Sequence, residues 1–564
     1  MILQELHRIQ ERCGFLPEAE LRALAERLRV PLYRLHEVAS FYPHFRLRPP
    51  PDVEVRVCRD MACFLRGAEK LWQNLEALGS ASVAVTGVSC LGQCDHAPAV
   101  AINDHIYGGK TEAELTDLIS ATAAGQELPR PRADRSPPAW RIDPYNGQPR
   151  YEAVRRFLEA KVDPAAAVLK SLEVAKLRGM GGAGFPTFRK WQAVRDAPGP
   201  TKYVVCNADE SEPGTFKDRE LLRRTPHLLI EGMVLAGLIT GAERGIIYVR
   251  HEYHDEIEAL QEALRAAEQQ GVCGGRLLGS ERSFPLELFI SPGGYICGEE
   301  SALLEALEDR RAEPRNKPPF PVQSGLFGKP TVVNNVETLC WVPAIVRHGG
   351  EWYRDQGVNG ATGLRLVSVS GDVNRPGVYE VPFGQAVRDL IATAGGMRDG
   401  QRLQAVAPSG PSGGFLPAIV QRENLPEKFI KDRLPAGATS YDILDLPLDF
   451  QSLSDIGSML GGAFVVIGER ANVVELARNC TAFFRNESCG KCVPCRVGSQ
   501  KLVELLRGPF PANGRELIGD LAEAMGLTSI CGLGQVAANP LTSVLRHFPT
   551  DFEQFISAKS RGSK

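Results

Sequence analysis

The chain has 564 residues, a length typical of roughly three to five domains rather than one hydrophobic core. Its content of 43% hydrophobic and 24% charged residues is that of a globular protein. The formal net charge of −3 gives no support to a nucleic-acid or polyanion partner.

The longest apolar stretch, HLLIEGMVLAGLITGA (residues 227–242), is interrupted by Glu231 and is too short to cross a bilayer. The sequence MILQELHRIQERCG at the start is amphipathic and has neither the apolar region nor the cleavage site of a signal peptide. We therefore expect a soluble, cytoplasmic protein. In a reducing compartment, clustered members of the 14 cysteines are expected to be metal ligands or redox groups rather than disulfides.

The first 125 residues predict helices followed by a small α/β domain. LPEAELRALAERLRV has apolar residues at helical spacing, and Pro31 can start the next helix. Beyond it, VEVRVC (residues 53–58) alternates like a strand, residues 67–79 have a helical pattern, and ASVAVTGVSC and PAVAIN predict two more strands. The Pro-rich stretch from Leu128 to Pro144 is a linker candidate.

The rest of the chain divides into three sections. Residues 146 to about 355 alternate between strands and helices, and KYVVCNAD and RGIIYVR have the continuous apolar character of buried parallel strands. From about residue 362, GLRLVSVSGDVNRPGVYEVP predicts a compact β-rich unit with a turn at NRPG, followed by the helix GQAVRDLIATAGG. Residues 453–564 are predicted to be mostly helical.

The segment ESCGKCVPCR carries three cysteines at C-x2-C-x2-C spacing, and a fourth cysteine lies in the Gly-rich turn TSICGLGQ. Four thiolates, three of them close together and one distant, suit a [4Fe–4S] cluster. Zinc is the main alternative, but a zinc ribbon has two C-x2-C pairs and the distant cysteine is single. The predicted ligands are Cys489, Cys492, Cys495 and Cys531.

A second set of cysteines follows two predicted strands near the start of the chain. VCRDMACFLRG contains Cys58 and Cys63, and SCLGQCDHAP contains Cys90 and Cys94. Two pairs in two loops can hold a [2Fe–2S] cluster, with two sulfurs on each iron. A zinc site and a redox pair are alternatives, although thioredoxin-type redox pairs use C-x2-C spacing.

Six further cysteines are solitary, and the expected role of each is that of a small buried hydrophobic side chain. They are Cys13, Cys206, Cys273, Cys297, Cys340 and Cys480.

LRGMGGAGFPTFRKW contains the pattern G-x-G-x-x-G at Gly179, Gly181 and Gly184. A dinucleotide-binding fingerprint requires a strand directly before this loop, and the preceding DPAAAVLKSLEVAKL is helical. Such a loop still allows backbone N–H groups to approach a phosphate or an aromatic ring. Phe185 could stack on a ring, and Lys190 could contact a phosphate.

Three more units stand out downstream. NADESEPGTFKDR follows a predicted strand, and VVNNVET contains Asn334 and Asn335. In GGYICGEESALLEALE, Glu299 and Glu300 lie at the start of a helix. Acids at that position have an equally good structural explanation as partners of the helix dipole.

With these units in this order, residues 177–338 and 487–531 resemble the flavin-bearing, NADH-binding subunit of respiratory complex I. The same subunit recurs in bidirectional hydrogenases and in NAD-dependent molybdenum or tungsten formate dehydrogenases. Residues 1 to about 125 resemble the smaller thioredoxin-like [2Fe–2S] subunit of these enzymes, here fused upstream.

The resemblance implies a multidomain α/β protein. Its expected parts are a thioredoxin-like [2Fe–2S] domain with amino-terminal helices (1–128), a linker (129–145), an FMN- and NAD-binding α/β domain (146–361), a β-grasp domain (362–445) and a helical [4Fe–4S] domain (446–564).

The resemblance also implies the site residues. FMN is expected to be held by Gly179, Gly181, Gly182, Lys190, Asn207, Asp209, Tyr295, Gly298, Glu299, Asn334, Asn335 and Thr338. NAD(H), stacked over the flavin, is expected to contact Phe185, Glu300, Lys317 and Phe320. Glu212 is a further cofactor-binding candidate, and Glu299 and Glu300 are the candidates for a role in the reaction.

Two positions depart from the family's common loop, GRGGAGFPTGxKW. Met180 replaces Arg and Phe188 replaces Gly, and a Phe could not adopt a positive φ without strain. In three features the chain resembles the β subunit of formate dehydrogenase more than the hydrogenase subunit. These features are Met180, the fused architecture and the segment FKDRELLRRTPHLLIEGM.

These resemblances imply a diaphorase module. NAD(H) transfers two electrons as a hydride, iron–sulfur clusters carry one, and a flavin converts between the two. The expected partner is a large molybdenum- or tungsten-containing subunit with further iron–sulfur clusters. The alternatives are a hydrogenase or complex I subunit, a non-catalytic electron-transfer scaffold without flavin, and a zinc-ribbon nucleic-acid binder, which the net charge does not support.

Overall fold

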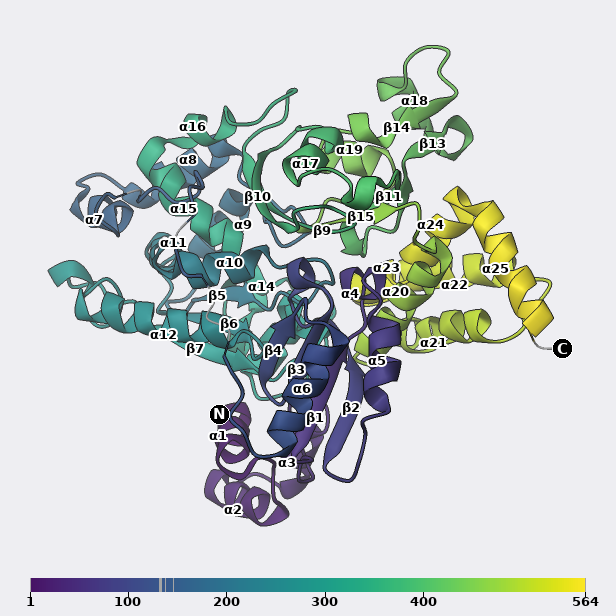
Figure 1. The fold of residues 1–564 in the computed structure, drawn as a ribbon. Coiled ribbons are helices and arrows are strands. Elements are labelled where there is room, and N and C mark those ends of the chain that lie inside the picture. The colour runs from purple at the N-terminus through teal and green to yellow at the C-terminus, as the bar shows by residue number, and fades with distance from the viewer. Residues whose placement is uncertain (1, 131–133, 137, 146, 563–564) are drawn as a thin grey trace. The chain divides into compact units, whose positions relative to one another are not determined.

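A computed structural model describes residues 2–130, 134–136, 138–145 and 147–562 (Figure 1). The chain forms two compact units, each assembled from separate stretches of sequence. The first unit comprises Met1–Asp52, Pro131–Glu210 and Lys217–Gln356, and the second comprises Val53–Arg130, Ser211–Phe216 and Gly357–Lys564. No helix among the described residues is long and apolar enough to span a membrane.

The first unit contains a four-stranded sheet in the order β7–β6–β5–β8. All three strand pairs are parallel, as predicted for KYVVCNAD and RGIIYVR. Because parallel strands end at the same edge, this sheet gathers the residues that follow each strand at one side. The strands are β5 (Tyr203–Ala208), β6 (Arg244–Arg250), β7 (Leu286–Ser291) and β8 (Thr331–Asn335).

Helices pack around this sheet, and the most buried of them is α11 (Pro226–Thr240). This is the apolar stretch that the sequence marked as too short for a membrane. Its Glu231 is buried and accepts hydrogen bonds from the Tyr145 hydroxyl at 2.6 Å and the Ala153 backbone N–H at 2.8 Å. The other main helices are α7 (Glu152–Glu159), α8 (Pro164–Ala175), α9 (Thr187–Asp196), α10 (Lys217–Arg224), α12 (His254–Gln269), α13 (Glu300–Leu307), α15 (Val336–His348) and α16 (Gly350–Arg354).

The amino-terminal helices α1 (Ile2–Cys13), α2 (Glu18–Leu28) and α3 (Leu32–Ala39) belong to this first unit. Pro31 precedes α3, as predicted. Long-range hydrogen bonds attach the segment, from the Leu3 N–H to Asp309 at 3.0 Å and from the Tyr42 hydroxyl to the Arg310 carbonyl at 2.5 Å. The expected domain of residues 1–128 therefore contributes to both units.

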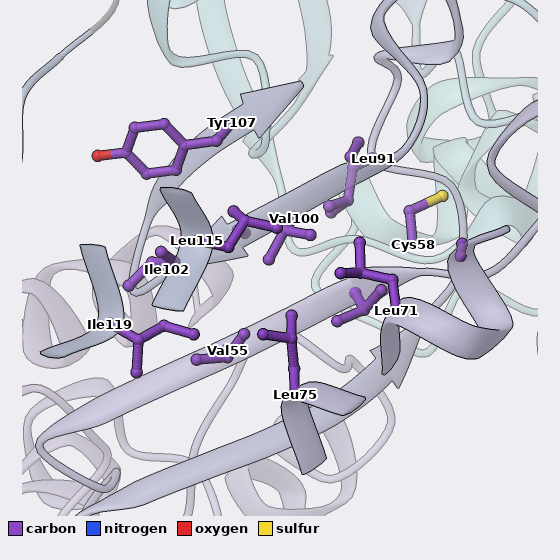
Figure 2. Close-up of a cluster of buried hydrophobic side chains, with 14 of the residues drawn as sticks. Val55, Cys58, Leu71, Leu75, Leu91, Val100, Ile102, Tyr107, Leu115 and Ile119 are labelled. Carbon is purple, nitrogen blue, oxygen red and sulfur yellow. The ribbon is translucent and has the colours of Figure 1, made fainter. Parts of the chain in front are cut away.

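The second unit begins with a sheet in the order β2–β1–β3–β4. Its strands are β1 (Val53–Cys58), β2 (Val83–Val88), β3 (Ala99–Ile102) and β4 (His105–Gly108). Helices α5 (Ala68–Glu76) and α6 (Glu112–Ala123) pack on it through Leu75 and Ile119, which meet Val55 and Val100 in one apolar cluster (Figure 2). The predicted succession of strand, helix and further strands is confirmed.

A second sheet in this unit has the order β10–β9–β15–β11–β12, in which β12 is the short strand Leu416–Pro417. Strands β9 (Leu364–Gly371) and β10 (Gly377–Pro382) pair antiparallel around the predicted turn at NRPG, and α17 (Val387–Thr393) forms the predicted helix after them. Strand β15 (Ala463–Gly468) lies inside the section expected to be mostly helical, yet it pairs with β9 and with β11 (Leu403–Pro411). Every residue of β15 is buried, which explains why its sequence, AFVVIG, has no alternating pattern.

The remainder of the second unit is helical, as predicted. Its helices are α20 (Val473–Glu487), α21 (Val493–Arg507), α22 (Gly514–Thr528), α23 (Gly532–Val536), α24 (Asn539–His547) and α25 (Pro549–Gly562). Of the predicted linker, residues 131–133 and 137 lie outside the described residues.

Candidate flavin, nucleotide and iron–sulfur sites

The glycine loop connects α8 to α9, so a helix precedes it, as the sequence predicted. The Gly179 N–H donates to the Phe185 carbonyl at 2.9 Å and closes the loop. Gly182 has a φ of 115°, a conformation that favours glycine. A Cβ on Gly181 would lie 3.2 Å from the Cβ of Asn335, so the loop passes close to the end of β8.

The two departures from the family loop have structural explanations. Met180 is buried, and its backbone N–H donates to Thr338 Oγ1 at 2.8 Å. Phe188 lies in the first turn of α9, where the negative φ of a helix suits any L-residue, so no glycine is required there. The strain considered for Phe188 is therefore absent, and that expectation is corrected.

Helix α9 holds Lys190 against the sheet. Its Nζ donates to the Val333 carbonyl at 2.9 Å and lies 3.6 Å from Glu300 Oε2. Burial lowers the pKa of Lys190, while Glu300 opposes that shift. One residue later, Trp191 donates from Nε1 to Asn334 Oδ1 at 2.8 Å and fixes that amide.

The carboxyl end of β5 contributes Asn207 and Asp209. The Asn207 amide donates to the Gly298 carbonyl at 2.8 Å, and Ser291 donates to Asp209 Oδ2 at 3.1 Å. A Cβ on Gly298 would be 3.2 Å from the Asp209 carbonyl. The short 3-10 helix Tyr295–Gly298 therefore lies against the loop after β5.

Glu299 and Glu300 meet Lys317, whose Nζ lies 2.8 Å from a carboxylate oxygen of each. Glu299 also caps α13, since its Oε2 accepts from the N–H groups of Ser301 and Ala302 at 2.9 Å. The structural explanation considered for these acids thus holds for Glu299. Burial raises the pKa of Glu300, but the two lysines outweigh this effect and leave the pKa lowered.

A buried charged network that sequence analysis missed supports Asn335. Lys217 lies 2.6 Å from Asp218 Oδ1, 3.0 Å from Glu337 Oε2 and 3.3 Å from Asn335 Oδ1, while the Asn335 amide donates to Asp218 Oδ2 at 2.5 Å. All three charged residues are buried. The signal in the sequence was the charged run FKDRE, directly after a strand and loop.

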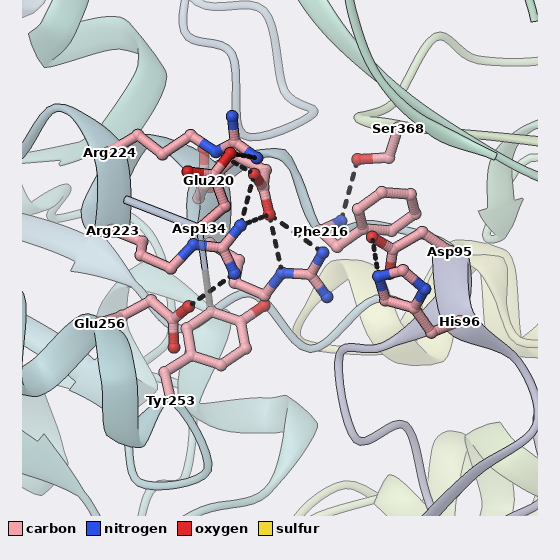
Figure 3. A network of polar contacts seen from close by, with 12 residues as sticks. Asp95, His96, Asp134, Phe216, Glu220, Arg223, Arg224, Tyr253, Glu256 and Ser368 are labelled. Atoms are coloured by element: carbon pink, nitrogen blue, oxygen red, sulfur yellow. Dashed lines mark hydrogen bonds and ion pairs between the residues drawn. The ribbon is translucent and has the colours of Figure 1, made fainter. Parts of the chain in front are cut away.

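Farther along α10, Figure 3 shows Arg223 between Glu220 and Glu256 and Arg224 beside Glu220. Arg223 lies 2.7 Å from Glu220 and 3.9 Å from Glu256. Burial raises the pKa of Glu256 to about 7. These partners fix the helix that carries Lys217.

Three predicted nucleotide contacts lie outside this buried group. Phe185 and Phe320 are half-exposed, at 51% and 50%, so each presents a ring face to solvent. Glu212 belongs to the second unit, where its Oε1 accepts from the Ser412 N–H at 3.0 Å. The assignment of Glu212 to a cofactor therefore depends on the resemblance alone.

The structure gathers the amino-terminal cysteines in the second unit. Cys58 ends β1, Cys63 lies in α4 (Ala62–Leu65), and Cys90 and Cys94 follow β2, with their sulfurs 3.8 Å apart. The buried thiols of Cys63 and Cys90 raise the pKa of Cys58 through hydrogen bonding, and burial adds to the effect. Within the described ranges, no three His, Cys, Asp or Glu side chains are arranged around a single metal ion.

The carboxyl-terminal cysteines lie where three helices begin or end. Cys489 follows α20, Cys492 precedes α21, Cys495 lies in its first turn and Cys531 precedes α23. Burial raises the pKa of Cys495 to about 11, and the thiols of Cys492 and Cys489 act in the same direction. A Cβ on Gly534 of α23 would be 2.9 Å from Cys495 Cβ, so the segment with Cys531 packs beside the triplet.

Of the solitary cysteines, five are buried, as expected. Cys13 is only half-buried, because it lies at the last position of α1.

Four family models match the chain. They are the Nuo51 FMN-binding domain over residues 172–344, the thioredoxin-like [2Fe-2S] ferredoxin over 1–123, the SLBB domain over 366–416, and the NADH-ubiquinone oxidoreductase-F iron-sulfur binding region over 475–555.

Curated relatives are similar over most of the chain. A subunit of the NADH-quinone oxidoreductase of Rhizobium meliloti (strain 1021) is 41% identical over 416 residues, which cover 72% of this chain and 93% of that protein. The NAD-reducing hydrogenase HoxS subunit alpha of Cupriavidus necator is 32% identical over 574 residues, which cover 97% of this chain and 90% of that protein.

Among solved structures, an NAD+-reducing [NiFe]-hydrogenase in the air-oxidized state matches with a TM-score of 0.83 and 33% identity, over 98% of this chain and 93% of that chain.

The residues of this chain fit the cofactors that the matching family descriptions name. Gly181 and Gly298 leave room that a Cβ would fill, and the Lys190 ammonium, which donates to the Val333 carbonyl, has further N–H groups of the kind that bind a flavin phosphate. Thiolates in two separate sets match a [2Fe–2S] and a [4Fe–4S] cluster. The chain therefore belongs to the family of FMN-, NAD(H)- and iron–sulfur-binding subunits of complex I-like enzymes.

Proposed function

We propose that this chain is the diaphorase subunit of an NAD-dependent formate dehydrogenase. It would pass electrons between NAD(H) and a separate molybdenum- or tungsten-containing subunit that oxidises formate. The observation that carries the diaphorase role is the convergence of Lys190, Glu300 and Lys317 beside the glycine loop, within one compact unit.

FMN, when bound, accepts a hydride as two electrons and releases these electrons singly. The chain's own residues bind and orient the two reactants. Half-exposed Phe185 and Phe320 present faces on which a nicotinamide nucleotide can stack. Lys317 and Glu300 hold each other in place, so the carboxylate of Glu300 is positioned to accept a hydrogen bond from the nucleotide.

No side chain in this arrangement has to move a proton for hydride transfer. The lowered pKa of Glu300, set by Lys190 and Lys317 against the effect of burial, keeps this residue a carboxylate at neutral pH. We infer a positioning role for Glu300, and for Glu299 a role in fixing both the start of α13 and Lys317.

The choice of formate as the partner's substrate rests on the sequence of the Met180 loop and on FKDRELLRRTPHLLIEGM. A second candidate is the diaphorase subunit of an NAD-reducing hydrogenase. It is favoured by the match over 97% of the chain to the HoxS subunit alpha, whose name states that activity for that protein.

Purification of the complex from its native host through a tag on this chain would separate the two candidates. The formate proposal expects a large subunit with molybdenum or tungsten and formate-dependent reduction of NAD+. A nickel-containing partner with hydrogen-dependent NAD+ reduction would replace it by the hydrogenase alternative.

A further inference from the structure

Helix α20 reaches the ligand loop of the predicted [2Fe–2S] site from 420 residues away in sequence. The loop runs from Cys58 to Cys63. The Asn479 side chain donates from Nδ2 to the Arg59 carbonyl at 3.0 Å, and its Oδ1 accepts from the Met61 N–H at 3.3 Å. One amide therefore fixes a carbonyl and an N–H group on either side of Asp60.

The loop needs such external support because one of its residues is strained. Met61 has a φ of 42° and a ψ of −107°, and its side chain is fully buried. A non-glycine residue in such a region is strained and persists only when its surroundings hold it. Cys480, the residue after Asn479, contributes a second contact, with its sulfur 3.0 Å from Met61 Sδ.

The same helix also touches the second half of the ligand set. Near the end of α20, Glu487 accepts a hydrogen bond from the Ser89 hydroxyl at 2.5 Å, and Ser89 directly precedes Cys90. Two residues beyond Glu487, the chain enters the other cysteine set at Cys489. Thus α20 contacts both [2Fe–2S] ligand loops and leads into the [4Fe–4S] ligand loop.

We propose that Asn479 is a positioning residue that sets the reduction potential of the [2Fe–2S] cluster. The potential of an iron–sulfur cluster depends on the hydrogen bonds that backbone N–H groups donate to its sulfurs. Asn479 engages the Met61 N–H and prevents the Arg59–Asp60 peptide from rotating. Removal of this amide allows both peptides to reorient and changes the number of N–H groups directed at the cluster.

The test is a redox titration of the full-length, cluster-loaded chain followed by electron paramagnetic resonance. In Asn479→Ala, we expect altered [2Fe–2S] g values and a tenfold change in the ratio of oxidised to reduced cluster at a fixed potential, which equals about 59 mV for one electron. The [4Fe–4S] signal is the internal reference and should keep its potential. The matched control is Asn486→Ala, an exposed residue on the same helix.

Asn479→Asp keeps the acceptor for the Met61 N–H but loses the donor to Arg59, so its [2Fe–2S] shift should differ from that of Asn479→Ala. If Asn479→Ala selectively loses the [2Fe–2S] signal, the redox titration of Asn479→Asp decides the proposal, and an unchanged potential in that variant overturns it. An unchanged [2Fe–2S] potential and spectrum would overturn it. Loss of the [2Fe–2S] and [4Fe–4S] signals in Asn479→Ala and in Asn479→Asp would also overturn the proposal, because Asn479 would then be needed only for folding. The outcome does not depend on which substrate the partner oxidises.

Discussion

Lys317 Nζ lies 2.8 Å from Glu300 Oε1, which pairs a lysine of the loop before α14 (Pro321–Ser324) with the first residue of α13. We expect Glu300→Ala to weaken NADH binding while the FMN content stays unchanged, since Lys190 keeps its bond to the Val333 carbonyl. The loss of one hydrogen bond, about 0.5–1.5 kcal/mol, would raise the Kd for NADH roughly 2- to 13-fold.

Calorimetric titration with NADH and fluorescence of acid-released flavin measure the two quantities. Glu351→Ala, an exposed acid on α16, is the control and should change neither. Loss of FMN with an unaltered Kd for NADH would show that Glu300 serves the flavin instead.

Cys531→Ser should remove the [4Fe–4S] signal and about four irons per chain, because a cubane cluster with three cysteine ligands loses its closing thiolate. FMN should remain bound, since its residues lie in the first compact unit and Cys531 in the second. Iron analysis and flavin release check both statements. Cys13→Ser, at a half-buried solitary cysteine, should keep all of its iron. A deficit of about six irons in Cys531→Ser, which is the content of both clusters, or no deficit at all would contradict the assignment.

Lys217→Met should destabilise the first unit, because it leaves Asp218 and Glu337 buried beside each other without their cation. Removing one member of a buried ion pair typically costs about 3–5 kcal/mol, so we expect a loss of that size. FMN affinity should fall as well, since Asn335 loses a partner. Urea unfolding followed by tryptophan fluorescence measures the effect against Lys170→Met, an exposed lysine on α8. An unfolding midpoint equal to that of the parent would refute the role of the network.

Because His7 is buried, we expect the folded chain to lose stability in acid. Burial, aided by His251, lowers the pKa of His7 from 6.5 to about 4. Between these values the unfolded chain binds a proton that the folded chain does not, so stability is lost as the pH falls from 6.5 to about 4. A shift of this size amounts to about 3 kcal/mol.

The variant His7→Phe, next to Phe45, should lose less stability over this pH range than the parent. Thermal unfolding of both chains from about pH 7.5 to about pH 4.5 gives the comparison. The control is His36→Phe, a half-exposed histidine on α3. Identical slopes for His7→Phe and the parent would mean that His7 is not a source of the acid sensitivity.

Much of the fold followed from sequence because its signals are local. Strands β5 and β6 were predicted from continuous apolar runs, and the helical segment before Gly179 correctly excluded a dinucleotide fingerprint. Strand β15 was missed, since a fully buried strand of six residues has no periodicity that separates it from a buried helix. The helical environment of Phe188 was missed for a related reason, because the family's glycine suggested a positive φ that the backbone does not have.

For the candidate site, too, local motifs were predicted from sequence and long-range contacts were not. The cysteine sets have spacings that favoured iron–sulfur clusters over zinc, whereas the assignment of the glycine loop to FMN came from the family resemblance. Lys217 with Glu337, and Asn479 with Met61, are separated by at least 120 residues, so only the folded chain brings them together. Glu299 illustrates a third case, in which the sequence allowed a structural and a functional explanation and the contacts show a helix cap.

The central claim is that this chain by itself converts a hydride from NADH into single electrons. Anaerobic addition of NADH to the isolated, cofactor-loaded chain tests it, with flavin absorbance, paramagnetic resonance and ferricyanide reduction as readouts. We predict bleaching of the flavin, the appearance of reduced-cluster signals, and two ferricyanide ions reduced per NADH, because ferricyanide accepts one electron and NADH supplies two. Formate should give none of these changes until a large subunit is added. Brown protein that releases no flavin in acid and does not oxidise NADH would contradict the account and identify a non-catalytic electron-transfer scaffold.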